Sequence, residues 1–295
     1  GGTILGTANR GNPFAREVLR NGVMIVEDIS DEIVAAIKKI KLDALIVIGG
    51  DGTLKISQEL FAKGVPVIGV PKTIDNDVGG TEVTFGFDTA LDTATEAIDK
   101  LHTTAESHHR VMVLELMGRD AGFIALHAGV AGGADVILIP EIPFHYDAVV
   151  RKIMRRIEGG RHFSILAVSE GAKSLEGEQV FSRSGDAVYL PRLGGVGHLV
   201  GSYIENNTEQ ETRVTVLGHI QRGGTPTPFD RWLATRYGAA ATRLAAQGDF
   251  GRMVSLSNGE VGDISLEEAL AVPKRVDVYG DGVRTARDMG IPLWG

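Results

Sequence analysis

Asp75 and Asp77, two aspartates separated by one asparagine, follow the apolar run Val65 to Val70. If this segment is extended, residues two apart face the same side, so the two carboxylates would point in one direction. One carboxylate can then take the proton of an attacking hydroxyl while the other orients a metal ion or the substrate, as phosphoryl transfer to an alcohol requires. A solvated turn is the alternative for an Asp-Asn-Asp run considered alone.

A glycine-rich stretch follows a second apolar run, Leu45 to Ile48, and precedes a segment of helical periodicity. Glycines let backbone N–H groups approach phosphate oxygens closely, and the start of a helix supplies partial positive charge. Asp51 could hold Mg²⁺ directly or through water, because this ion prefers few carboxylates and keeps several waters. The stretch therefore predicts a phosphate site made by Gly50, Asp51, Gly52 and Thr53, with a purely structural turn as the alternative.

Several further loops follow apolar runs and carry charge. Arg119, in Glu115 to Gly122, could clamp a transferring phosphoryl group, or form an ordinary surface ion pair. His219 could donate to a sugar phosphate, or be a capped surface residue. Glu170 and Arg222 lie in loops of the same kind, and Arg110 and Arg213, which precede or begin predicted strands, supply further cations.

Short β-branched runs alternate with longer segments of helical periodicity, which indicates βαβ units and a mostly parallel sheet. Strands are predicted at 44–48, 65–70, 111–116, 136–139, 164–168 and 213–216. Helices are predicted at 54–62, 89–104, 120–130, 146–158, 193–206 and 231–246. Ligands in such folds bind at the carboxyl ends of the strands, which is where the loops above lie.

Composition excludes several classes of function. The 295 residues carry a net charge of −8, which argues against binding a nucleic-acid backbone. The absence of cysteine excludes disulfides, thiolate metal sites and a cysteine nucleophile. Apolar stretches are too short to span a bilayer, so we expect no membrane partner and a cytoplasmic location.

Taken together, the motifs resemble the 6-phosphofructokinase family, and the resemblance extends from Gly1 to about Ala271. A Gly-Gly-Asp-Gly loop also occurs in NAD and lipid kinases, but those families lack the other motifs in this order. The motifs are Gly49-Gly50-Asp51-Gly52, Thr73-Ile74-Asp75-Asn76-Asp77, Met117-Gly118-Arg119, Ser169-Glu170-Gly171 and Gly218-His219-Ile220-Gln221-Arg222-Gly223-Gly224.

The resemblance implies transfer of a phosphoryl group from ATP, with Mg²⁺, to the 1-hydroxyl of fructose 6-phosphate, a glycolytic step. It assigns Asp75 as the base, Asp51 to the metal, and Thr73 with Arg119 to the transferred phosphoryl group. Donor binding would involve Gly50, Asp51, Gly52, Thr53, Arg10 and Lys72. The sugar phosphate would be held by Asp77, Met117, Gly118, Glu170, His219 and Arg222.

In the family, the residues that match Arg110 and Arg213 reach the sugar phosphate of a neighbouring subunit, so a homotetramer or homodimer is expected. The family fold has two Rossmann-like three-layer α/β/α domains with mostly parallel sheets. A nucleotide-side domain would comprise residues 1–86 plus 221–271, and a sugar-side domain residues 87–220 plus 272–295. Family members begin with a further strand and phosphate loop upstream of Gly1, so the N-terminal part of the first domain is expected to be missing from this sequence. Residues 272–295 show no recognisable chemistry and are expected only to pack against the sugar-side domain.

Two positions bear on the phosphoryl donor. Pyrophosphate users in the family carry Asp at the position of Gly52 and Lys at that of Lys72, whereas ATP users carry Gly at both. This sequence is mixed, and ATP is favoured because Gly52 leaves space for the α-phosphate of a nucleotide. A pyrophosphate-dependent enzyme is one alternative, and a catalytically silent subunit or fragment that binds sugar phosphate is another.

Overall fold

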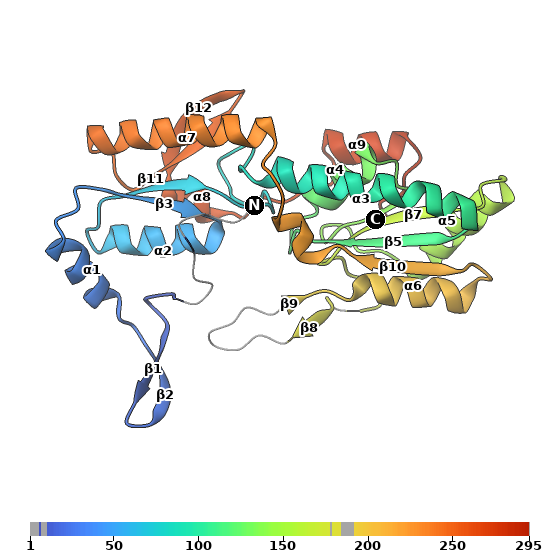
Figure 1. The fold of residues 1–295 in the computed structure, drawn as a ribbon, viewed down its shortest axis with the longest axis horizontal. Helices are drawn as coiled ribbons and strands as arrows, with labels where there is room; N and C mark the ends of the chain where they lie inside the picture. The colour runs from blue at the N-terminus through green and yellow to red at the C-terminus, as the bar shows by residue number, and fades with distance from the viewer. Residues whose placement is uncertain (1–5, 7–10, 178, 184–191, 295) are drawn as a thin grey trace.

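The computed structural model describes residue 6 and residues 11–177, 179–183 and 192–294 (Figure 1). Two four-stranded sheets lie side by side, each between layers of helices. The predicted α/β fold with mostly parallel sheets is confirmed. Within the described ranges no helix is both long enough and apolar enough to cross a membrane.

The first sheet has the order β12-β11-β4-β3. Its strands β3 (Leu45–Gly49), β4 (Val67–Pro71) and β11 (Arg252–Ser257) are parallel, and β12 (Glu260–Ser265) is antiparallel to β11. Ile68 and Val70 of β4 pack against α7 (Pro228–Gln247), whereas Val67 packs on the opposite face with α1 (Ser30–Lys39) and α2 (Asp51–Ala62). The short helix α8 (Leu266–Ala271) lies beside α2 and begins with a capping box made by Ser265 and Glu268.

The second sheet has the order β10-β5-β7-β6, and all of its pairs are parallel. Its strands are β5 (Val111–Leu116), β6 (Val136–Leu138), β7 (Ser164–Ser169) and β10 (Thr212–Val216). One face is covered by α3 (Phe87–His108), α4 (Phe123–Ala131) and α9 (Asp281–Asp288), the other by α5 (Tyr146–Glu158) and α6 (Val196–Asn207). Strands β5 and β7 are fully buried, as expected for a parallel sheet covered on both sides.

Hydrogen bonds between the starts of α3 and α7 join the two halves of the molecule. The buried Asp230 of α7 accepts hydrogen bonds from the backbone N–H of Thr89 at 2.8 Å and from its hydroxyl at 2.5 Å. Thr227, which caps α7, donates its hydroxyl to Asp88 at 2.5 Å. The backbone N–H of Thr227 donates in turn to the Thr89 hydroxyl at 3.2 Å, so each helix start is capped partly by the other, which fixes the two sheets relative to each other.

The structure adds elements that the sequence analysis did not predict. β1 (Arg16–Arg20) and β2 (Val23–Glu27) form a hairpin that extends away from the first sheet (Figure 1). The antiparallel pair β11–β12 and the short pair of β8 (Phe181–Arg183) and β9 (Arg192–Leu193) were also missed. The proposed limits 1–86 plus 221–271 and 87–220 plus 272–295 remain a prediction, although α7, β11 and β12 do return to the first sheet.

Candidate active site

The turns that follow β3 and β4 are in direct contact. The backbone N–H of Lys72 donates to the carbonyl oxygen of Gly49 at 2.8 Å. A Cβ atom added to Gly49 would lie 2.5 Å from that of Thr53, and one added to Gly50 would lie 3.3 Å from that of Thr73. Glycine is therefore needed at Gly49 to let the backbone fold tightly against its neighbours, and a side chain at Gly50 would press on Thr73.

Gly52, the second residue of α2, differs from Gly49 and Gly50 in having open space where a side chain would lie. A Cβ atom added there would meet nothing within 4 Å, so packing within the chain does not demand glycine. The open space lies at the N-terminal end of α2, where unpaired backbone N–H groups attract anions. Space for a ligand is a sufficient physical reason for glycine at this position.

Asp51 is the first residue of α2, and its carboxylate forms an ion pair with Lys55 at 2.8 Å. Its side chain is 34% exposed, so the carboxylate remains accessible to a ligand. The described residues contain no group of three or more histidine or acidic side chains arranged to hold a metal. A Mg²⁺ ion bound by one carboxylate, waters and ligand phosphates needs no such group, and the donor set present here fits that kind of ion.

The turn after β4 is braced by its own side chains. The hydroxyl of Thr73 donates to Oδ2 of Asp75 at 3.3 Å and accepts the backbone N–H of Asp75 at 3.1 Å. Asp75 is 6% exposed, and its Oδ1 is buried without a hydrogen-bond partner among the described residues. Oδ1 of Asp77 is likewise buried without a hydrogen-bond partner among the described residues. Buried carboxylate oxygens without partners are ready to accept a ligand's proton or hydrogen bond.

The expectation of an extended Asp-Asn-Asp segment is wrong. Asn76 lies in the left-handed region with φ of 55°, so the chain turns sharply between the two aspartates. Asparagine tolerates this conformation better than most residues because its short polar side chain can bond locally. Here its Oδ1 accepts the backbone N–H of Thr84 at 3.1 Å.

Charges from separate loops act on the two aspartates. Burial raises the pKa of Asp75, while the positive charges of Arg222, Arg119 and Lys72 act in the opposite direction. Burial and, next, the charge of Asp75 raise the pKa of Asp77 to about 6, and the charge of Asp51 adds to this rise. Charged residues that are far apart in the sequence therefore act on the same two carboxylates.

The turn after β5 is fixed by close backbone contacts. Gly118 has φ of 138°, and a Cβ atom there would lie 2.6 Å from the carbonyl oxygen of Ala121. Arg119 is left-handed with φ of 52°, and its N–H donates to Oε1 of Glu170 at 3.2 Å. A Cβ atom on Gly171 would lie 1.9 Å from the carbonyl oxygen of Arg119. Holding a non-glycine residue in this region costs about 1–3 kcal/mol, so the surrounding contacts must impose it.

Arg119 and Arg222 have no acidic partner among the residues that the structure describes. Among the described residues neither guanidinium forms an ion pair within 4.0 Å, although both charges act on Asp75. Arg222 and the exposed His219 lie on the 3₁₀ helix η1 (Gly218–Arg222), which follows β10. Met117 is half-buried and packs against the core beside this region. Unpaired arginines next to a carboxylate are suited to binding phosphate.

Arg110 and Arg213 are not part of this cluster. Arg110 precedes β5 and forms an ion pair with Glu211 at 2.8 Å, and Arg213 of β10 is paired with the same carboxylate. Both arginines lie at the amino end of the sheet, whereas Met117 and His219 follow the carboxyl ends of the same strands. Six strand residues span about 20 Å, so the two groups cannot contact one small ligand bound to a single chain. Arg10 lies outside the described residues.

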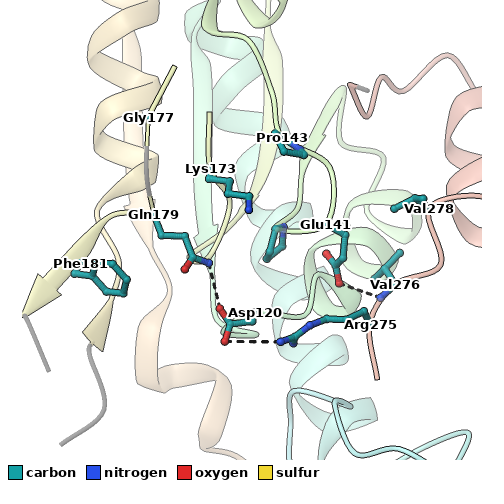
Figure 2. Close-up of a pocket in the computed structure, with 11 residues that line it drawn as sticks. Asp120, Glu141, Pro143, Lys173, Gly177, Gln179, Phe181, Arg275, Val276 and Val278 are labelled. Atoms are coloured by element: carbon teal, nitrogen blue, oxygen red, sulfur yellow. Dashed lines mark hydrogen bonds and ion pairs between the residues drawn. The ribbon is translucent and has the colours of Figure 1, made fainter. Parts of the chain in front are cut away.

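A cavity of about 890 Å³ opens beside the turn that carries Arg119 (Figure 2). Its lining includes Asp120, Glu141, Lys173 and Arg275 but none of the predicted site residues. Asp120 accepts a hydrogen bond from Gln179 at 3.1 Å and lies 3.9 Å from the Arg275 guanidinium. The cavity therefore borders the predicted site without including it.

Sequence reasoning missed the part that the C-terminal segment contributes. The carboxylate of Glu141 accepts the backbone N–H groups of Gly122 at 3.0 Å and of Val276 at 2.9 Å, which fastens this segment beside the Arg119 turn (Figure 2). The neighbouring Lys274 donates to Asn76 at 3.1 Å. No periodicity or motif marks Lys274 in the sequence, because its role depends on a contact across 198 positions.

Comparisons with known proteins identify the family of this chain. The phosphofructokinase family model matches residues 1–245. A Chloroflexus aurantiacus protein named ATP-dependent 6-phosphofructokinase is 54% identical over 99% of this chain and 79% of its own length. An Amycolatopsis mediterranei protein named pyrophosphate–fructose 6-phosphate 1-phosphotransferase is 50% identical over 94% of this chain and 78% of its own.

Among solved structures, phosphofructokinase of Pichia pastoris in the T-state superimposes with a TM-score of 0.76 at 30% identity, covering 92% of this chain and 28% of that one. The sequence match to the first of these relatives extends over 99% of this chain. The chain therefore belongs to the phosphofructokinase family.

Proposed function

We propose that the protein transfers the terminal phosphoryl group of ATP to the 1-hydroxyl of fructose 6-phosphate, giving fructose 1,6-bisphosphate and ADP. One observation carries the proposal. Asp75 is a buried carboxylate with an unpartnered oxygen, in the turn that contacts the Gly50 turn and in the field of Arg119 and Arg222. A proposed base, a proposed phosphate-binding turn and two arginines without an ion pair among the described residues therefore support this reaction.

In the proposed reaction, Asp75 accepts the proton of the 1-hydroxyl as that oxygen attacks the γ-phosphorus in line. The bond from this phosphorus to the β,γ-bridging oxygen breaks, and ADP leaves with the electron pair. Charge develops on the transferred group and the leaving oxygen, where the Arg119 guanidinium and the Thr73 hydroxyl would stabilise it. Burial favours this chemistry because it raises the proton affinity of the Asp75 carboxylate.

Fructose 6-phosphate would lie against the turns after β5, β7 and β10. Glu170, which already accepts the N–H of Arg119, would keep its other oxygen for a sugar hydroxyl. His219 and Arg222 would bind the 6-phosphate, since both lie on η1 and Arg222 has no ion pair within the described residues. Asp77, Met117 and Gly118 would complete the sugar site.

ATP would place its phosphates on the turn formed by Gly50, Asp51, Gly52 and Thr53, with Lys72 and Arg10 assisting. The open space at Gly52 supports a nucleotide, because an α-phosphate needs room at that point. Mg²⁺, held by Asp51 and the phosphates, would supply charge neutralisation of the triphosphate when bound. The proposed substrates are glycolytic metabolites, for which a cytoplasmic location is expected.

A second donor has specific support. Lys72 matches the lysine of pyrophosphate users, and the similar Amycolatopsis mediterranei protein carries a pyrophosphate-dependent name. Parallel measurement of kcat/KM for ATP and for pyrophosphate, each with fructose 6-phosphate and Mg²⁺, separates the two. We expect ATP to be preferred by at least about 10-fold, equivalent to about 1.4 kcal/mol in transition-state binding. A preference for pyrophosphate would reject the ATP assignment.

Calorimetry that detects fructose 6-phosphate binding without turnover with either donor would instead indicate a silent sugar-phosphate-binding subunit.

Arg110 and Arg213 support a homo-oligomer, because they lie too far from the site of their own chain to bind a ligand there. In a homodimer or homotetramer they would reach the sugar phosphate of a neighbouring subunit, once released from Glu211. Neither nucleic acid nor a membrane enters this proposal.

A further inference from the structure

Lys274 connects the C-terminal segment to the turn that carries Asp75 and Asp77. Its ammonium donates to Oδ1 of Asn76 at 3.1 Å and to the carbonyl oxygen of Glu82 at 2.5 Å. Its backbone N–H donates to the carbonyl oxygen of Asp77 at 2.9 Å, and its ammonium lies 5.2 Å from the ring centroid of Phe123. Lys274 therefore contacts the turn through both its side chain and its backbone.

Asn76 is the residue whose conformation sets the direction of the two aspartates. It is left-handed, and one atom of its side chain, Oδ1, accepts from both Lys274 and the backbone of Thr84. The Thr84 hydroxyl in turn donates to the carbonyl oxygen of Thr73 at 2.8 Å. Two donors on one amide oxygen fix the rotation of the Asn76 side chain and, with it, the backbone between Asp75 and Asp77.

The environment of Lys274 suits a structural cation. Burial lowers its pKa to about 8, while the charges of Glu82 and Asp77 act in the opposite direction. At neutral pH the ammonium is therefore still charged, and charge-assisted hydrogen bonds are stronger than neutral ones. An aromatic ring beside the ammonium adds cation–π attraction.

We propose that Lys274 is a positioning residue of this active site: by holding Asn76 it fixes the left-handed turn that aims the carboxylate of Asp75 at the acceptor hydroxyl. The idea rests on the proposed phosphoryl transfer for its kinetic consequence. Lys274 acts through Asn76 and not on the substrate, so its loss should impair the chemical step more than the binding of either substrate.

Replacing Lys274 with methionine keeps the apolar stem and removes the three donors. We expect kcat to fall about 10- to 100-fold, the loss that a misplacement of about 1 Å produces, with KM for fructose 6-phosphate changed less than about 3-fold. Lys152→Met is the matched control, because Lys152 also donates to a carbonyl of the C-terminal segment, that of Gly290 at 2.8 Å, but its charged neighbours are Arg156 and Asp135, outside the proposed site. Its kcat should remain within about 2-fold of wild type. An unchanged kcat in Lys274→Met would overturn the proposal.

A double-mutant cycle with Asn76 tests the route of the effect. Asn76→Gly removes the acceptor while keeping a residue that adopts positive φ without strain. If Lys274 acts through Asn76, adding Lys274→Met to Asn76→Gly should lower kcat by less than about 3-fold further. A full 10- to 100-fold additional loss would show that Lys274 acts elsewhere and would reject the positioning role.

Hydrogen exchange provides a readout that does not depend on activity. In Lys274→Met the amides of residues 73–84, including that of Thr84, should exchange faster, whereas those of β5 should not change. If the wild-type protein lacks phosphofructokinase activity, the proposed function fails, and exchange still decides whether Lys274 orders the turn. Equal exchange in the two proteins would reject the proposal. Lys274→Gln, which keeps an N–H donor without the charge, replaces the methionine variant if the latter does not fold.

Discussion

Gly50 lies so near Thr73 that a Cβ atom added to Gly50 would be 3.3 Å from the Cβ atom of Thr73. The Thr73 hydroxyl donates in turn to the carboxylate of Asp75 at 3.3 Å. The side chain of Thr73 therefore lies between the turn after β3, which we propose to bind phosphate, and the proposed base Asp75. A donor phosphate on the first turn and an acceptor hydroxyl at Asp75 would be neighbours.

Gly52→Asp should change the preference between phosphoryl donors without harming the fold. The open space at Gly52 accepts a side chain, and an acidic residue in the first turn of a helix is favourable. Because its carboxylate would repel an α-phosphate, we expect kcat/KM for ATP to fall about 100-fold or more, and that for pyrophosphate to change much less. Steady-state kinetics with both donors provide the measurement.

Gly238→Asp is the matched control for this substitution. Gly238 also lies in a helix, α7, and a Cβ atom there would likewise meet nothing within 4 Å. Its donor preference should equal that of wild type. Equal losses with the two donors in Gly52→Asp would mean that this position does not discriminate between them.

Asp77→Asn should make the folded protein more stable at neutral pH. The pKa of Asp77 is raised from 3.8 to about 6, so the folded state binds its proton more tightly than the unfolded state does. The wild-type protein should therefore lose the contribution of this group to its unfolding free energy as pH rises from 3.8 to about 6. The asparagine variant should show no such loss. The difference in unfolding free energy should grow to at most about 3 kcal/mol above pH 6.

Urea unfolding of both proteins at several pH values between 4 and 8, without Mg²⁺, gives this difference directly. If the difference in unfolding free energy between the two proteins does not change with pH, the pKa of Asp77 is not raised in the folded state. A loss of activity in the same variant is expected, because Asp77 lies in the proposed sugar site.

Glu115→Gln should destabilise the protein through α6. The buried Glu115 carboxylate accepts the backbone N–H groups of Gly195 at 3.0 Å and Gly197 at 2.7 Å, at the start of that helix. A glutamine amide brings an N–H₂ group toward these donors, so we expect a loss of about 1–3 kcal/mol. Denaturant titration checks this value. Glu96→Gln, which alters only the exposed ion pair with Lys100, should lower the unfolding free energy by less than about 1 kcal/mol. If the two variants are destabilised equally, Glu115 does not cap α6.

Mixed oligomers test whether neighbouring chains share a site. Asp75→Ser and Arg213→Ala should each be inactive alone, because one lacks the base and the other the arginine that would serve a neighbour. Co-expressed in equal amounts, they should recover about a quarter of wild-type activity, since that fraction of shared sites receives both intact residues. If the co-expressed mixture is no more active than either variant alone, Asp75 and Arg213 do not act together at a site shared between chains.

Much of the fold follows from local patterns in the sequence. The apolar runs predicted at 44–48 and 65–70 became β3 and β4, and the helix predicted at 146–158 is α5. The hairpin of β1 and β2 was missed because it is exposed along most of its length and so lacks the alternation of buried and exposed residues. β12 was missed because none of its residues is fully buried and its exposure does not alternate along the strand.

The site was predictable where chemistry depends on residue type and position along a strand. The turns that carry Gly50, Asp75 and Arg119 do follow β3, β4 and β5. The left-handed Asn76 was not predictable, because its conformation is held by contacts with Thr84 and Lys274. Such contacts depend on tertiary packing and leave no local pattern.

The account depends most directly on Asp75 as the base, and Asp75→Ser tests it. With ATP, Mg²⁺ and fructose 6-phosphate at saturation, we expect kcat to fall about 10² to 10⁴-fold, the usual cost of a lost general base. The midpoint of thermal unfolding should not fall, since burial already disfavours the charged form of this carboxylate. Asp281→Ser, at a position where the side chain is 89% exposed, should behave as wild type. Turnover by Asp75→Ser within about 3-fold of wild type would contradict the account.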